Sequence, residues 1–124
     1  KEYSAKAVSL LENMRSGGWS DYSVEMNIAV LCDKIGDTRS AMQLLEGMLE
    51  VPEYANNYYI IYIRLAYCEA DMQGNLDVLE RDYTKFDEYF QSAKKECDAN
   101  NISDAEMDRL LQIRDELAEL GWLK

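Results

Sequence analysis

Histidine is absent from this chain of 124 residues, and proline occurs only once, at Pro52. Histidine is the commonest general base and the commonest ligand of transition metals, so its absence removes the usual centre of both kinds of site. No stretch approaches the roughly 20 apolar residues of a membrane-spanning helix. The longest candidate, residues 58–66, contains Arg64. These absences weigh against a catalytic, metal-binding or membrane-inserted protein.

Cysteine is also scarce, and Cys32, Cys68 and Cys97 form no Cys-x-x-Cys motif. Their odd number and wide spacing argue against a disulfide framework or a structural zinc, and for a reducing compartment such as the cytoplasm. We expect Cys32 and Cys68 to be small buried hydrophobic residues. No signal peptide is visible and the first residue is not Met, so we expect a piece of a longer protein.

Basic residues are outnumbered, because 24 acidic residues against 13 basic ones give a net charge of −11. The phosphates of nucleic acids and the headgroups of anionic membranes would be repelled by this charge. We therefore expect neither nucleic acid nor a membrane as a partner. The acidity is typical of a well-solvated helical surface.

Hydrophobic spacing predicts an all-α fold of about six helices. The expected helices cover approximately residues 2–15, 21–34, 38–50, 57–73, 81–97 and 102–120. Glycines and asparagines separate these segments, and Ser103 with Glu106 has the spacing of a capping box. In the second helix we expect an inward stripe of Val24, Ile28, Leu31 and Cys32. Short connections favour antiparallel hairpins that stack in chain order.

One spacing of small and bulky residues recurs along the chain, with steps of four and then three residues. It occurs in Ala7, Leu11 and Met14, in Ala41, Leu45 and Met48, and in Phe86, Phe90 and Ala93. Recurrence at several tens of residues is the signature of a helical repeat array. We therefore expect one domain, 1–124, made of a half repeat (1–18), two repeats (19–52 and 53–99) and a closing helix (102–120).

This pattern resembles the tetratricopeptide repeat. The first full repeat has Ala29 at the small position of its first helix, Gly36 and Asp37 in the turn, Ala41 in the second helix and Pro52 after it. The second repeat departs from the family, since Phe86 stands at the usual alanine and lies 20 residues after Ala66, against 12 residues from Ala29 to Ala41. The resemblance implies antiparallel hairpins stacked into a right-handed superhelix. A plain helical bundle is the alternative.

A second resemblance concerns context. The sequence segments 27–31, 64–67 and 81–83 are similar to segments of helical-repeat regions attached to bacterial serine/threonine protein kinases. This resemblance implies a regulatory or docking region of a larger protein. The chain itself contains no glycine-rich loop, His-Arg-Asp or Asp-Phe-Gly element of a kinase.

The resemblance also suggests where a partner binds, because the first helix of each repeat lines the concave face of such arrays. Aromatic residues and arginine dominate binding hot spots, so this face suits a peptide or protein partner. Tyr59, Ile63 and Tyr67 form a tyrosine-rich stripe on the expected fourth helix. Alternatively, this stripe belongs to the hydrophobic core or to the interface of a homodimer. The candidate partner-binding residues are Met26, Asn27, Val30, Tyr59, Ile63, Arg64 and Tyr67.

A less favoured hypothesis places acidic residues in a metal-binding loop. These residues are Asp71, Asp77 and Glu80. Their spacing does not match a calcium loop, so a polar connection between helices is favoured. We expect no catalytic residue, cofactor or metal. The predicted function is a non-enzymatic protein interaction module; a self-associating scaffold is the first alternative, and an enzyme or metal-binding helical domain is the second.

Overall fold

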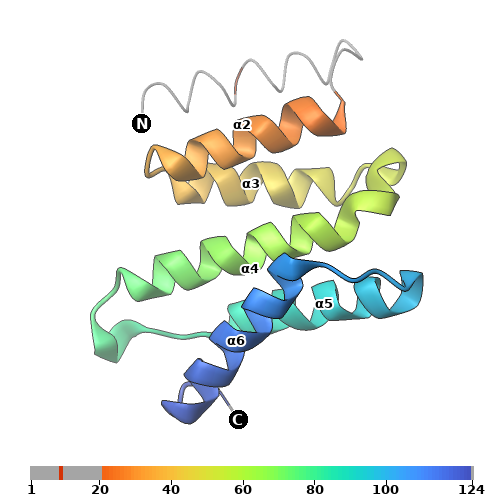
Figure 1. Ribbon diagram of the computed structural model, residues 1–124. Helices are drawn as coiled ribbons and strands as arrows, with labels where there is room; N and C mark the ends of the chain where they lie inside the picture. Colours follow the sequence, from red (N-terminus) through yellow and green to blue (C-terminus); the bar gives the residue numbers. More distant parts are fainter. Residues whose placement is uncertain (1–8, 10–20, 124) are drawn as a thin grey trace. The chain divides into compact units, whose positions relative to one another are not determined.

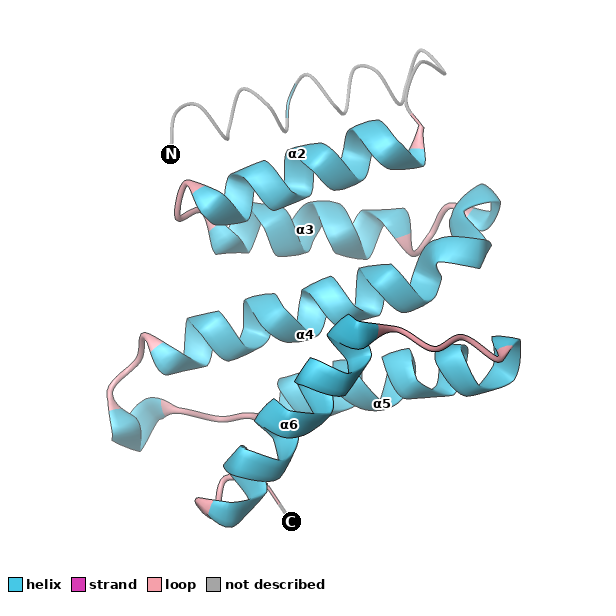
Figure 2. Cartoon of the chain, in the orientation of Figure 1, coloured by secondary structure: helices cyan, strands magenta, loops and turns pink. Residues whose placement is uncertain are grey.

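The computed structural model describes Ser9 and residues 21–123, and the chain divides into two compact units, Lys1–Ala55 and Asn56–Lys124. The described residues contain five α-helices and no strand, which confirms the all-α class (Figure 2). The division lies close to the repeat junction predicted between residues 52 and 53. Apart from Ser9, the predicted half repeat 1–18 lies outside the described residues.

In the first unit, helices α2 (Tyr22–Lys34) and α3 (Thr38–Met48) form an antiparallel hairpin (Figure 1). The carboxylate of Asp21 caps α2 by accepting a hydrogen bond from the Val24 N–H at 2.9 Å. Gly36 has a φ of 90°, a left-handed conformation in which the Asp37 N–H reaches the Cys32 carbonyl at 2.9 Å. Asp37 then caps α3. The predicted turn at residues 36 and 37 is confirmed.

The hairpin buries the two alanines of the repeat pattern, since Ala29 is 1% exposed and Ala41 is 0% exposed. The predicted inward residues of α3 are confirmed as buried; they are Ala41, Leu44, Leu45 and Met48. Without long side chains at the two alanine positions, the helix backbones can approach closely.

The predicted stripe of α2 is confirmed at Cys32 and wrong at Leu31, whereas Val24 and Ile28 are half-buried. The buried side chains of α2 are Glu25, Ala29 and Cys32, while Leu31 is 41% exposed. The buried carboxyl group of Glu25 accepts a hydrogen bond from the Tyr54 hydroxyl. Tyr54 lies in the 3-10 helix η1 (Pro52–Asn57), within which the unit boundary falls. A buried acid is tolerated here because a hydrogen bond offsets part of its desolvation.

In the second unit, α4 (Tyr58–Gly74) and α5 (Thr84–Asn100) run antiparallel, and α6 (Ala105–Glu119) lies obliquely across them (Figure 1). The residues with the recurring spacing in α5, Phe86, Phe90 and Ala93, are buried, and so are Tyr89 and the preceding Tyr83. The two buried leucines of α6 are Leu110 and Leu117. The three helices therefore enclose one aromatic-rich core.

The eight extra residues between the second pair of helices form a connection that contains the 3-10 helix η2 (Val78–Glu80). Arg81 holds this connection by donating to the carbonyl of Leu76 at 2.9 Å and to that of Gly74 at 3.0 Å. The insertion is therefore a loop between the two helices that the hydrogen bonds of Arg81 hold in place.

The predicted capping box of Ser103 and Glu106 is wrong, because Asp104 is the capping residue. Its Oδ1 accepts a hydrogen bond from the Glu106 N–H at 2.8 Å. The predicted stop after α5 is confirmed at Asn101, whose φ of 54° is left-handed. Asparagine adopts this conformation more readily than most residues.

We expect Ala29→Leu to destabilise the first unit by roughly 1–3 kcal/mol, because the added atoms would overpack a fully buried position. The matched control is Gln43→Leu, at an exposed position on α3. Thermal melts of both variants measure the effect. Equal melting temperatures for the two variants would contradict a close contact at Ala29.

Candidate partner-binding site

The candidate residues of the first unit lie on α2. Asn27 is exposed, and Met26 and Val30 are half-buried. Met26 and Val30 are four residues apart, so they occupy one stripe of the helix. This stripe differs from the one that Ala29 and Cys32 bury. The first unit therefore offers a mixed apolar and polar strip.

The candidate residues of the second unit lie on α4. Arg64 is exposed, Tyr59 and Tyr67 are half-buried, and Ile63 is 3% exposed. The side chains of this stripe therefore differ in exposure, since a buried isoleucine lies between two half-buried tyrosines. Arg64 presents the most accessible polar group of the four. One concave face shared by both units stays a prediction.

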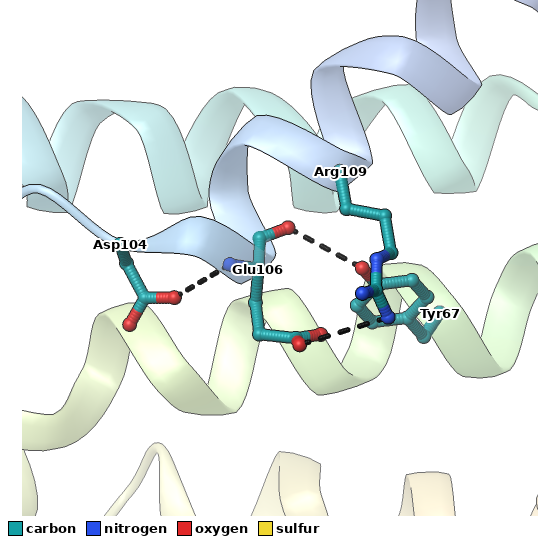
Figure 3. A network of polar contacts seen from close by, with 4 residues as sticks. All are labelled: Tyr67, Asp104, Glu106 and Arg109. Carbon is teal, nitrogen blue, oxygen red and sulfur yellow. Dashed lines mark hydrogen bonds and ion pairs between the residues drawn. The ribbon is translucent and has the colours of Figure 1, made fainter.

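Tyr67 is the candidate residue with the best-defined surroundings (Figure 3). Its hydroxyl donates a hydrogen bond to the backbone carbonyl of Glu106 on α6, at 3.3 Å. The carboxylate of Glu106 lies 3.8 Å from the guanidinium of Arg109, one turn further along α6. Asp104 fixes the start of the same turn through its bond to the Glu106 N–H. The tyrosine therefore joins α4 to the capped first turn of α6.

Charge and burial both favour the neutral form of this tyrosine. Burial raises the pKa of Tyr67 to about 12, together with the charge of Glu106 and a hydrogen bond to it, against opposing effects of Arg109 and Arg64. Two guanidinium groups thus lie within electrostatic reach of one tyrosine hydroxyl. A partner's carboxylate or backbone carbonyl is the group that such cations bind, whereas the proton of the Tyr67 hydroxyl is already donated to Glu106.

Glu106 and Arg109 were not among the candidate residues from the sequence. The contact that brings them to Tyr67 joins α4 to α6, which are separated by the whole of α5. The Glu106–Arg109 spacing of three residues is the only local signal, and it marks merely an exposed helix pair.

The alternative metal reading gains no support from the geometry. Asp71, Asp77 and Glu80 are all exposed. In the described part of the chain, no three cysteine, aspartate or glutamate side chains gather in a way that could hold a metal ion. Cys32, Cys68 and Cys97 are buried, and no disulfide joins them.

Comparisons with protein-family models, with curated proteins and with solved structures found no match to this chain. Among the described residues, no helix combines the length and the apolar character needed to cross a membrane.

We expect the stability difference between the wild-type chain and Tyr67→Phe to depend on pH. A pKa raised from 10 to about 12 means that the neutral tyrosine stabilises the fold fully below pH 10, and that this contribution is lost as the pH rises towards 12. The wild type should therefore lose stability relative to Tyr67→Phe over this interval. Urea unfolding at a series of pH values measures the difference. A difference that stays constant through the interval would contradict the raised pKa.

Proposed function

We propose that this chain is a tetratricopeptide-like repeat domain that acts, without enzymatic activity, as a protein–protein interaction module. The main support is the pairing of helices at small residues. Ala29 and Ala41 are buried in the α2–α3 hairpin, and Ala66 and Ala93 are buried in the α4–α5 hairpin. Repeats of such hairpins stack to complete a core and leave one face for partners. The proposal requires no catalytic residue, cofactor or metal.

The accessible candidate residues form one proposed binding strip in each unit, on α2 in the first unit and on α4 in the second. Met26, Asn27 and Val30 supply apolar contact and an amide, while Tyr59, Arg64 and Tyr67 supply aromatic surface and a cation. Tyrosine and arginine are enriched among residues that dominate binding energy. A peptide or protein segment with an apolar side chain and an acidic or carbonyl group fits this chemistry. Ile63 is buried, so it packs inside the second unit and does not contact the partner directly.

The wider context of the proposal is a regulatory or docking region of a larger, kinase-like bacterial protein. This part rests on the similarity of the sequence segments 27–31, 64–67 and 81–83 to helical-repeat regions attached to such kinases. A cytoplasmic location is supported by three buried cysteines that no disulfide joins.

The test begins with selection of binding peptides from a random displayed library against the whole chain. The affinity of a selected peptide is then measured by calorimetry for the wild type, Asn27→Ala and Arg64→Ala. We expect Arg64→Ala to weaken binding by roughly tenfold or more, the usual effect of truncating a hot-spot arginine.

The matched control is Arg39→Ala, which removes an exposed arginine from α3 and should leave binding unchanged. Failure to select any saturably binding peptide would contradict the interaction module. A selected peptide that binds both α2 and α4 variants like the wild type would contradict the proposed surface.

The second candidate function is a self-associating scaffold, such as a homodimer. It is favoured by the apolar side chains around η2, where Val78 is 60% exposed and Leu79 is fully exposed. Apolar side chains that gather on a surface often mark an association site.

If self-association occurs there, Leu79→Ser should shift the monomer–dimer equilibrium towards the monomer. The melting temperature should change little, because Leu79 is fully exposed in the described part of the chain. Sedimentation velocity over a range of concentrations measures the equilibrium. A wild-type chain that stays monomeric throughout the range would exclude this candidate.

A further inference from the structure

A pocket lies in the second unit between the last turns of α5 and the first turns of α6. Its volume is about 220 Å³. Pockets for whole small molecules usually measure about 300–1,000 Å³, so this one has room for a single side chain. Its lining residues are Phe90, Lys94, Cys97, Asp98, Ile102, Ser103, Asp104, Met107, Asp108 and Leu111.

The apolar part of the pocket comes from both helices and from the turn between them. Phe90 and Cys97 on α5 are buried, Ile102 and Met107 are half-buried, and Leu111 on α6 is 45% exposed. These side chains form an apolar surface that is only partly covered by the chain itself. The methylene groups of a long side chain would bury against it.

The polar part of the pocket is acidic. Asp98, Asp104 and Asp108 face a single lining cation, Lys94, whose ammonium group already pairs with Asp98 at 2.9 Å. Asp104 uses Oδ1 for the helix cap, which leaves Oδ2 without a hydrogen bond among the described residues. Asp108 makes no side-chain hydrogen bond or ion pair within the same part of the chain. Two carboxylates are therefore left to meet a cation.

The neighbouring arginines of α6 do not neutralise these carboxylates. Arg114 pairs with Asp87 at 2.7 Å and lies over the Phe90 ring, and Arg109 lies closest to Glu106. Cys97, which lines the pocket, is buried near these acids. Burial raises the pKa of Cys97, and the charges of Asp104, Asp98 and Glu96 raise it further. The pocket is therefore negative, and its thiol stays protonated.

We infer that this pocket binds the side chain of an arginine from a partner protein. Asp104, which caps α6, and Asp108 in the first turn of this helix both line the pocket. A guanidinium group has a planar fork of donors that can reach two carboxylates at once, whereas an ammonium group is a point charge. The apolar walls suit the arginine methylenes. None of the lining residues belongs to the surface proposed above for α2 and α4, so this inference does not rest on that proposal.

In the test, the isotope-labelled whole chain is titrated with N-acetyl-arginine methylamide. The amide chemical shifts in NMR spectra monitor the binding. We expect saturable shifts at residues 97–111. N-acetyl-citrulline methylamide, which has nearly the same shape without the charge, should cause none. N-acetyl-lysine methylamide should bind more weakly than the arginine compound.

Two variants test the carboxylates, and both are designed to keep the fold. Asp104→Asn retains a side chain that caps helices well, and Asp108→Asn changes an exposed residue. Each should weaken binding of the arginine compound by roughly tenfold, the effect of losing a hydrogen bond to a charged group. Asp115→Asn is the matched control on α6, since it removes the same charge from an exposed position outside the pocket.

Several results would overturn the inference. They are an absence of saturable shifts at residues 97–111, equal binding of the citrulline compound, equal binding of the lysine compound, or an equal loss of affinity in Asp115→Asn. The peptide selection against the α2 and α4 surface can fail or succeed independently of this titration. The two proposals are therefore distinguishable.

Discussion

The burial of small residues in each helix hairpin is the constraint on which the rest of the structure depends. Ala29 and Ala41 in one hairpin, and Ala66 and Ala93 in the other, are each at most 1% exposed. A larger side chain at any of them would separate its pair of helices and leave the bulky residues of the neighbouring turns without contacts. Phe86 in the second hairpin is a bulky residue that is 0% exposed, and its ring meets the ring of Tyr83 edge-on at a centroid distance of 6.4 Å.

Among the described residues, sequence reasoning predicted the helices and most of their ends, because these depend on neighbouring residues. Gly36 and Asp37 determine their turn by backbone conformation and capping, which are local effects. The prediction of the inward stripe of α2 failed in part, for a different reason. Hydrophobicity assigns Leu31 to the core and Glu25 to solvent, yet the structure does the opposite, because the Tyr54 hydroxyl meets the acid in the interior. A signal was nevertheless present, since Glu25, Ala29 and Cys32 have the same steps of four and three residues that mark the other buried stripes. The repeat spacing was a better guide than residue type.

The candidate site was predictable only in part, for a related reason. The tyrosines and Arg64 of α4 are conspicuous in the sequence, whereas the partners of Tyr67 come from α6, almost forty residues away. Ser103 has the spacing of a capping residue, but Asp104 takes the role, which shifts the start of α6 by one position. Which side chains of α6 meet α4 depends on how the two helices pack, and local sequence patterns do not determine that packing.

Helix α6 and its cap contribute an acid–base pair to one side of the second unit and two acids to another. Glu106 and Arg109 lie by Tyr67 of α4, where Arg64 adds a second guanidinium. Asp104 and Asp108 instead line the pocket against α5. Because one short helix supplies both sets, a change in its position would alter both surfaces together. Asp104 belongs to both arrangements, since its Oδ1 fixes the first turn while its Oδ2 is left for the pocket. A cation bound by Asp104 would therefore act on the same turn that carries the Glu106 carbonyl to Tyr67, so that the cap of α6 physically links the acidic pocket to the face of α4.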